Sequence, residues 1–423
     1  MTVGALQRPF HFLFLQGPSS RFFDQVARGL RARGHKVSRI NLHFGDRLFW
    51  SLPAKDFRGT FDQWRSFVAN FIDKNCITHI VFLGDRRPYH VVASDEANAR
   101  GLEIICTDMG YLRPDWITLE RDGTTASSRF PSEADRIRVL ASGFPSPNLA
   151  PMFPTPFWQL AVNDLVYNAG AVLLGFLYPH YRRHTLYHPF HEYAGWLGRF
   201  VSSPLRRRRT RQAIETLSSS LEPFVLVPLQ LSTDYQIRKN SPFPDMETAL
   251  KTIIASYAHH GSKIYKLVIK IHPLDPGLTP WRRLVAEQTS LHRLHGRIVW
   301  LDGGDLPWLL AKAWGVVTVN STVGISALQA GCRLFALGTA IYDVAGLTFQ
   351  EDLDSFWAIA QPPDPTLVDE FIRALAELTQ IKGDYITSKG RAAAAQKAVE
   401  RLDQGLHWLP RRPDIVQAGA DPK

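Results

Sequence analysis

The stretch Phe10-His-Phe-Leu-Phe-Leu-Gln-Gly-Pro-Ser19 sets the fold class of this chain. A mostly apolar run followed by a glycine–proline turn is typical of a buried strand that ends in a loop. Phe22 to Arg33 follows with apolar residues at helical spacing and stops at Gly34, a common residue for ending a helix. Lys36 to Leu42 then predicts a second strand.

The same alternation continues through the first third of the chain. We expect a helix over Phe61 to Asp73, a strand over Ile77 to Leu83, a helix over His90 to Arg100 and a strand over Gly101 to Cys106. This βαβαβαβ order predicts a parallel sheet with helices on both faces. Ligands of such sheets bind beyond the carboxyl ends of the strands.

The alternation restarts at Pro223 and predicts a second parallel α/β domain. Its strands are expected at Phe224 to Val227, Leu267 to Ile271, Ile298 to Leu301, Val316 to Val319 and Leu334 to Leu337. We therefore divide the chain into an N-terminal Rossmann-like domain, a helical basic and aromatic insert, a second Rossmann-like domain and a helical tail, over residues 1–150, 151–211, 212–360 and 361–423.

Composition fits a globular protein with an anionic partner. The 423 residues suggest two or three domains, and 45% hydrophobic and 21% charged residues exclude a largely disordered chain. The net charge is +10, and the segment from Tyr181 to Arg211 holds eight arginines and one acidic residue. Three cysteines far apart in the sequence, with no signal-peptide pattern and no run long enough to span a bilayer, predict a cytoplasmic protein.

Several common catalytic motifs are missing from the sequence. It has no P-loop, no G-x-G-x-x-G after a strand, no H-E-x-x-H, no C-x-x-C and no G-x-S-x-G. This argues against a P-loop NTPase, a dinucleotide-dependent dehydrogenase, a zinc enzyme and an α/β-hydrolase. We expect neither a metal site nor a bound cofactor.

The second domain carries the candidate residues for binding a nucleotide-linked donor. Asn320-Ser321-Thr322-Val323-Gly324 follows a strand and opens a helix, where free N–H groups either bind phosphate or are simply capped by these side chains. His272 and Pro273 end another strand at the same edge, in a position to bind a phosphate or to be purely structural. Gln230, Asp234 and Arg238 lie in a polar loop that either lines the cleft or is only solvated.

The first domain carries the candidate carboxylates. Asp85 and Asp108 fall at strand ends, and glycosyl transfer needs a carboxylate near the anomeric carbon. Arg87 and Arg113 either steer an anionic sugar or pair with these aspartates, and Gln16 ends the first strand on the acceptor side. Asp115 and Glu120 are further acidic candidates.

The basic run Arg206-Arg207-Arg208-Arg209 ends the aromatic-rich insert. Lysine and arginine near an anionic bilayer each contribute about 1 kcal/mol, and tryptophan and tyrosine favour the interface. The insert therefore predicts contact with a membrane surface, although a solvated basic helix pair would show the same pattern. Because no nucleic-acid motif is present, we expect no nucleic-acid partner.

Several motifs in this order resemble the capsular polysaccharide biosynthesis and export proteins of the KpsS type. They are Phe14-Leu-Gln-Gly-Pro18, Arg39-Ile-Asn-Leu42, Gly45-Asp-Arg-Leu-Phe-Trp50, Gly84-Asp85, Arg87-Pro-Tyr-His90, Gly110-Tyr-Leu-Arg-Pro-Asp-Trp-Ile-Thr-Leu-Glu120, Asp234-Tyr-Gln-Ile-Arg238, His272-Pro273, Asn320-Ser-Thr-Val-Gly324 and Ile341-Tyr-Asp-Val-Ala-Gly-Leu-Thr348. The similarity covers roughly Phe10 to Trp357.

The resemblance implies a GT-B glycosyltransferase, with two Rossmann-like domains facing a cleft. It also implies a retaining β-Kdo transferase that uses CMP-Kdo and a phosphatidylglycerol-type lipid acceptor at the bacterial inner membrane, alongside other capsule assembly proteins. In related retaining transferases an acidic residue before the Gly-Tyr motif acts in catalysis, and the matching position here is Asp108. The family often has glutamate there, sometimes followed by a second acidic residue, whereas this chain has Asp108-Met109. His272 and Asn320 to Gly324 match positions expected to bind the CMP phosphate and the Kdo carboxylate.

Two alternatives remain open from the sequence. One is a transferase of the same fold with another CMP- or CDP-linked donor, such as CDP-glycerol. The other is a non-catalytic export or scaffold protein that has kept the fold.

Overall fold

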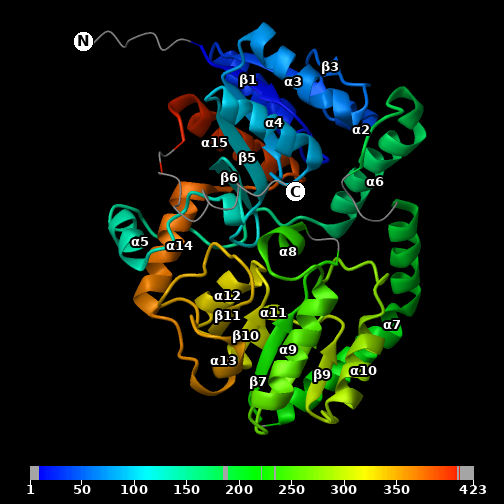
Figure 1. The fold of residues 1–423 in the computed structure, drawn as a ribbon, viewed down its shortest axis with the longest axis vertical. Coiled ribbons are helices and arrows are strands. Elements are labelled where there is room, and N and C mark those ends of the chain that lie inside the picture. Colours follow the sequence, from blue (N-terminus) through cyan, green and yellow to red (C-terminus); the bar gives the residue numbers. More distant parts are fainter. Residues whose placement is uncertain (1–8, 184–188, 221, 233–234, 407–408, 410–423) are drawn as a thin grey trace. The chain divides into compact units, whose positions relative to one another are not determined.

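The computed structural model describes residues 9–183, 189–220, 222–232, 235–406 and 409. The chain divides into two compact units. The first unit comprises Met1–Phe130, Pro147–His184 and Leu375–Lys423, and the second comprises Pro131–Ser146 and Thr185–Ala374. Both are α/β units built on sheets with parallel strands, so the predicted fold class is confirmed (Figure 1).

The first unit is built on a seven-stranded sheet with the order β12-β6-β5-β4-β1-β2-β3. The strands from β1 to β5 are parallel where they pair, whereas β6 runs antiparallel to β5 and β12 antiparallel to β6. Their bounds are β1 His11–Phe14, β2 Lys36–Asn41, β3 Lys55–Asp56, β4 His79–Leu83, β5 Glu103–Met109, β6 Trp116–Arg121 and β12 Gln380–Lys382.

Helices cover both faces of this sheet because alternate residues of a strand point to opposite sides. Phe12 and Phe14 belong to one core, with Val399 and other residues of the C-terminal helix, whereas Leu13 belongs to a second core with Trp64. The helices are α1 Phe22–Ala32, α2 Phe44–Leu48, α3 Phe61–Asn75, α4 Pro88–Ala99, α6 Phe157–Leu173 and α15 Ser388–Gln404. A Cβ at Gly29 would lie 2.6 Å from Val399 Cγ2, so glycine lets α1 approach α15 closely.

The second unit has a five-stranded parallel sheet with the order β11-β10-β7-β8-β9. Val225 and Val227 pack with Ile253 and Tyr257 of α9 in one buried core. The strands are β7 Phe224–Pro228, β8 Lys266–Lys270, β9 Ile298–Leu301, β10 Ala313–Thr318 and β11 Arg333–Ala336. The helices are α5 Ala134–Ala141, α7 Pro189–Ser219, α8 Tyr235–Asn240, α9 Met246–His260, α10 Trp281–Leu291, α11 Leu306–Lys312, α12 Val323–Gln329, α13 Leu353–Ile359 and α14 Pro365–Thr379; α14 runs on into the first unit.

The units divide the sequence differently from the expected domains. Within the predicted insert, α6 belongs to the first unit and α7 to the second. The C-terminal segment belongs mainly to the first unit, where β12 extends the sheet and α15 covers α1. None of the helices in the described part of the chain is long and apolar enough to cross a bilayer.

Candidate active site

The candidate residues of the first unit gather at the carboxyl ends of three strands. Gln16 follows β1, Asp85 follows β4, and Asp108 lies near the end of β5. Because β1, β4 and β5 are consecutive neighbours in the sheet, these residues share one edge. Gln16 is buried, and its Nε2 donates a hydrogen bond to the Tyr181 hydroxyl at 3.1 Å.

Asp108 carries a half-buried carboxyl group at this edge. Its Oδ1 accepts a hydrogen bond from the Met109 N–H at 2.7 Å. Burial raises the pKa of Asp108 to about 6; the charge of Asp85 adds to this rise, whereas the Met109 N–H, Arg87 and Arg113 oppose it. The carboxyl group is therefore mostly ionised at neutral pH but close to its titration range.

A residue from the C-terminal segment holds the end of β5 in place. The buried Tyr385 hydroxyl donates a hydrogen bond to the backbone carbonyl of Asp108 at 2.8 Å and also bonds the Thr107 hydroxyl. Asp115 is held in a similar way, since Lys382 Nζ lies 3.0 Å from its Oδ1. Asp115 Oδ2 accepts the N–H groups of Met152 and Phe153, so Asp115 has a structural role.

Arg87 and Arg113 supply positive charge near Asp108. Among the described residues, neither guanidinium forms an ion pair or a side-chain hydrogen bond, although both charges act on the pKa of Asp108. Arg86 is the arginine beside Asp85, with Nε 3.6 Å from Oδ2. Attraction of an anionic sugar by Arg87 and Arg113 stays a prediction.

Asp85 is the second predicted catalytic carboxyl group. It is buried, and burial raises its pKa while Arg86 opposes the rise. A Cβ at position 123 would lie 2.5 Å from Asp85 Oδ2, so Gly123 leaves the space that this carboxyl group occupies. A direct role in catalysis remains a prediction for Asp85.

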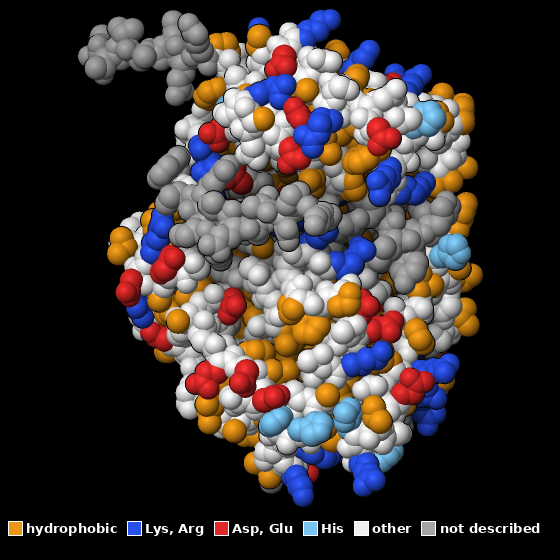
Figure 2. Space-filling model, in the orientation of Figure 1, with side chains coloured by type: hydrophobic (Ala, Val, Ile, Leu, Met, Phe, Trp, Pro, Cys, Tyr) orange, Lys and Arg blue, Asp and Glu red, His pale blue; other side chains and the backbone are white. Residues whose placement is uncertain are grey.

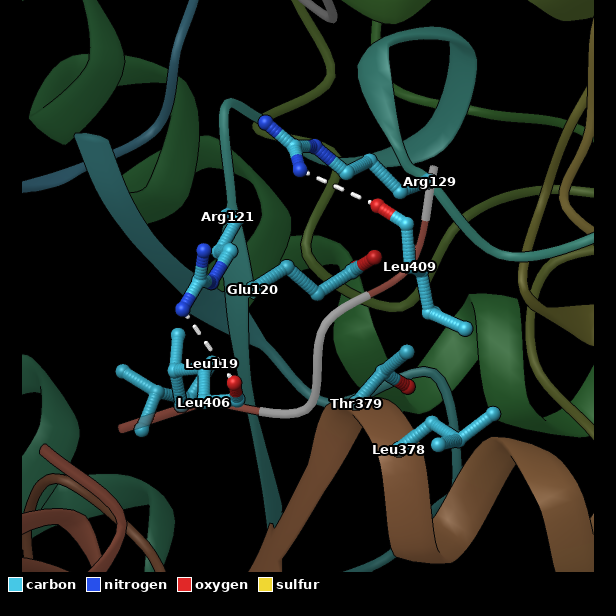
Figure 3. A pocket seen from close by; sticks show the side chains of 8 residues that line it. All are labelled: Leu119, Glu120, Arg121, Arg129, Leu378, Thr379, Leu406 and Leu409. Atoms are coloured by element: carbon cyan, nitrogen blue, oxygen red, sulfur yellow. Dashed lines mark hydrogen bonds between the residues drawn. The ribbon is translucent and has the colours of Figure 1, made fainter. Parts of the chain in front are cut away.

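Glu120 lies in the same sheet but lines a different space. It is buried, accepts a hydrogen bond from Ser128 Oγ, and has a pKa raised to about 8, chiefly by burial. Figure 3 shows it at a cavity of about 20 Å³ that Arg121 and Arg129 also line. Arg121 donates a hydrogen bond to the Leu406 carbonyl at 3.2 Å, and Arg129 donates one to the Leu409 carbonyl at 3.0 Å. Because this space fits about one water molecule, the cavity that Glu120 lines is too small for a substrate.

A buried ionic cluster, which the sequence analysis missed, lies after β2. The carboxylate of Asp46 accepts the Tyr167 hydroxyl at 2.9 Å and the Leu42 N–H at 2.9 Å, and Arg39 Nη2 lies 3.8 Å away. His43 Nε2 lies 3.0 Å from the same Tyr167 hydroxyl. The cluster holds α6 at the strand edge, and the signals for it in the sequence were the motifs Arg39-Ile-Asn-Leu42 and Gly45-Asp46-Arg47.

In the second unit, two predicted donor-binding residues form a reciprocal amide pair. Gln230 Nε2 donates to Asn320 Oδ1 at 2.8 Å, and the Asn320 N–H donates to Gln230 Oε1 at 3.1 Å. Gln230 follows β7 and Asn320 follows β10, the neighbouring strands at which the strand order reverses. Open α/β sheets bind ligands at such a switch point.

The turn after β10 is packed against an aromatic ring. The Tyr342 hydroxyl donates to the Ser321 carbonyl at 2.7 Å, and a Cβ at position 324 would lie 2.3 Å from the Tyr342 ring. Ser321 Oγ accepts the Val323 N–H at 3.2 Å, so part of the helix start is capped locally. No capping bond is made by the Thr322 side chain.

The remaining donor candidates lie on nearby segments of the second unit. His272 follows β8 and is half-buried, and its Nδ1 accepts the Leu274 N–H at 3.1 Å, which leaves Nε2 to carry the proton of the neutral ring. Pro273 is exposed, and Arg238 is half-buried in α8. Asp234 lies outside the described residues.

The four predicted membrane arginines have different surroundings. Arg206 is half-buried and forms an ion pair with Asp302 at 2.9 Å, whereas Arg207, Arg208 and Arg209 are exposed. In the described ranges, no three His, Cys, Asp or Glu side chains are grouped so as to hold a metal ion.

A family model described as "Capsule polysaccharide biosynthesis protein" matches residues 78–386. The chain therefore belongs to this family, which confirms the resemblance inferred from the motifs.

Two curated relatives match along most of their length. The chain is 31% identical over 398 residues to the capsule polysaccharide modification protein LipB of Neisseria meningitidis serogroup B, covering 90% of this chain and 92% of that protein. It is 31% identical over 387 residues to the capsule polysaccharide export protein KpsS of Escherichia coli, covering 88% and 96%. Among solved structures, the β-Kdo 2,7 transferase of Thermosulfurimonas dismutans KpsC matches with a TM-score of 0.46 at 13% identity, covering 94% of this chain and 99% of that one.

Proposed function

We propose that this chain is a capsule biosynthesis glycosyltransferase that moves Kdo from CMP-Kdo to a phosphatidylglycerol-type lipid with retention of configuration. The observation that carries the proposal is the half-buried Asp108 carboxyl group, with a pKa of about 6, near two arginines that have no acidic partner among the described residues. A retaining transferase needs a carboxylate nucleophile, and an anionic donor needs positive charge beside it.

The reaction proceeds in two displacements. An Asp108 carboxylate oxygen bonds to the anomeric carbon, while the bond from that carbon to the phosphate oxygen breaks and CMP leaves with the electron pair. An acceptor hydroxyl oxygen then attacks the same carbon from the opposite face and releases Asp108, and Asp85 is the candidate to take the hydroxyl proton. Two inversions give net retention.

The proposal also gives binding roles to the predicted residues. Arg87 and Arg113 attract the carboxylate of the sugar acid. Gln230, Asn320 and His272 bind the nucleotide part, because they lie at the strand edge where α/β units hold nucleotides. The lipid acceptor places the protein at the inner-membrane surface, where other capsule assembly proteins are its proposed partners.

The test is mass spectrometry of a phosphatidylglycerol analogue incubated with the protein and with CMP-Kdo generated in situ. Addition of one Kdo mass is the expected result, and the anomeric configuration of the product then tests retention. CMP release without transfer would support CMP-Kdo as the donor and reject the phosphatidylglycerol-type lipid as the acceptor. Absence of both, with turnover of CDP-glycerol, would reject the donor. Absence of all turnover, with unaltered capsule export in an Asp108→Asn strain, would indicate a scaffold.

A further inference from the structure

A basic groove lies in the second unit, between α7 and the ends of β8 and β9. Its volume is about 630 Å³, and four arginines line it: Arg199, Arg206, Arg207 and Arg211. The carboxylates in its wall are Asp302 and Glu215, so positive charge is in excess. A cavity of this size and charge fits an anionic headgroup.

The inner wall of the groove is rigidly built. Asp302 Oδ1 bonds Arg199 Nη2 at 2.8 Å and Arg206 Nη1 at 2.9 Å, so a single carboxylate holds both guanidinium groups. Arg206 Nη2 also donates to the Arg199 carbonyl at 2.6 Å, and the Asp302 N–H donates to Thr210 Oγ1 at 3.2 Å. These bonds fix α7 against the end of β9 and set the shape of the groove before any ligand arrives.

The outer rim carries the available charge. Arg207 and Arg211 are four residues apart, so they lie one above the other on α7. Both are exposed, and neither forms an ion pair or a side-chain hydrogen bond within the described ranges. Two adjacent guanidinium groups can bind the oxygens of one phosphate.

An apolar stripe continues from this rim along α7. Its members are Leu197, Phe200, Val201 and Leu205, which are 65%, 77%, 73% and 52% exposed. At 100° per residue Phe200 falls between Arg207 and Arg211 around the helix, and Arg208 falls within the stripe. Figure 2 shows hydrophobic side chains exposed along the edge where Figure 1 places α7, with Lys and Arg side chains near them.

We propose that this groove binds the phosphate headgroup of an anionic phospholipid, with Arg207 and Arg211 contacting the phosphate and the apolar stripe of α7 entering the lipid surface. The proposal deepens the proposed function, because it gives the lipid a binding site on this chain. A stripe of exposed apolar side chains beside paired arginines matches an amphiphile better than a soluble polyanion. The arginine run is thereby divided, since Arg208 and Arg209 do not line the groove.

The test compares two double variants of equal charge change in the full chain. Vesicle flotation is measured with phosphatidylcholine vesicles that contain 20% phosphatidylglycerol, at about 150 mM salt, where long-range attraction is screened. We expect Arg207→Ser/Arg211→Ser to weaken binding about tenfold or more, and Lys251→Ser/Arg282→Ser, at exposed positions of α9 and α10 outside the groove, about threefold or less. Equal losses of vesicle binding in the two double variants would reject the groove as a binding site and indicate a general electrostatic effect.

Two further measurements separate the source of the phosphate and the role of turnover. Inorganic phosphate at a few millimolar is expected to leave flotation unchanged, and displacement of the protein would show a free-phosphate site in place of a lipid site. Flotation needs no donor, so it reports on the groove even if Kdo transfer fails. Kdo transfer to the lipid with wild-type flotation of Arg207→Ser/Arg211→Ser would overturn the groove while preserving the proposed function.

Discussion

The hydroxyl of Tyr385 donates a hydrogen bond to the backbone carbonyl of Asp108 at 2.8 Å, across 277 residues of sequence. The tyrosine ring is buried against Phe22, with ring centroids 5.1 Å apart. The candidate nucleophile is therefore positioned by a residue from the opposite end of the chain.

Replacing Tyr385 by phenylalanine is expected to slow transfer without weakening donor binding. The change removes two buried hydrogen bonds, to the Asp108 carbonyl and the Thr107 hydroxyl, each worth about 1 kcal/mol, and lets the end of β5 shift. We expect kcat to fall about tenfold while the KM for CMP-Kdo stays within about twofold. Tyr257→Phe, which removes a hydroxyl–carbonyl bond of the same kind in the second unit, is the control. Equal falls of kcat in the two variants would argue against a positioning role for Tyr385.

Asp108→Asn is expected to reduce transfer by at least a thousandfold and to leave the protein folded. The pKa of Asp108 is raised, so its ionised form is less stable in the folded protein, and this cost is present above pH 6 and absent below the unfolded pKa. The variant should therefore melt at or above the wild-type temperature at pH 8. Asp62→Asn, at an exposed position of α3, is the control for the transfer assay and for the melting temperature. Wild-type turnover by Asp108→Asn would reject the nucleophile.

The pH dependence of transfer reports on the same carboxyl group. A nucleophile must be ionised, so kcat/KM should fall as the pH drops through about 6. Arg87→Gln removes a charge that lowers this pKa, and its acid limb should move to higher pH. Arg136→Gln, half-buried on α5, should leave the limb in place. A limb that stays fixed in Arg87→Gln would show that another group controls the profile.

Glu120→Gln is expected to stabilise the protein in a pH-dependent way. The folded-state pKa of about 8 lies above the unfolded value, so wild-type stability falls as the pH rises from about 4.5 to 8. Glutamine cannot ionise and avoids this loss, so the gain in unfolding free energy should be small at pH 4.5 and about 2–4 kcal/mol at pH 8.5. Urea unfolding at several pH values measures it. A gain that is independent of pH would contradict the raised pKa.

Gly324→Ala is expected to destabilise the turn after β10. The added methyl group would overlap the Tyr342 ring, at a cost of about 1–3 kcal/mol, and would disturb Ser321 and Asn320. Thermal unfolding and titration of CMP measure the two effects. Gly143→Ala, where a Cβ meets nothing within 4 Å, is the matched control. Tyr342→Phe, combined with Gly324→Ala, should recover part of the loss because the closest contacts include the hydroxyl oxygen.

Most strands of the two sheets were predictable because they are apolar runs that alternate with helical patterns, whereas β3 and β6 were not predicted. β12 was not, since Gln380-Ile-Lys382 is too short to show a period and pairs with residues more than 260 positions away. The C-terminal segment was therefore expected to be mostly helical. The helices of the insert were expected, but its division between two units depends on long-range contacts such as Tyr167 to Asp46 and Arg206 to Asp302.

The site was predictable to the extent that it follows strand ends. Gln16, Asp85, Asp108, Gln230 and Asn320 were predicted in this way, and their roles stay predictions. Each lies at or just after the end of a strand, and Gln230 and Asn320 are direct hydrogen-bond partners. Tyr385 was not found, because a tyrosine in a helical tail gives no local signal. The sequence also showed no sign that Arg206 differs from the other arginines of the run, because its partner Asp302 lies 96 positions further along the chain.

The antiparallel pairing of β12 with β6 also affects the order of events during synthesis. The edge of β6 emerges from the ribosome early, but its partner strand is translated only after the second sheet is complete. The second unit can therefore complete its own sheet first. Until β12 is made, β6 of the first unit has an unpaired edge, which can pair with another nascent chain. A chaperone that shields exposed strand edges would thus matter most in the interval between translation of Arg121 and Lys382.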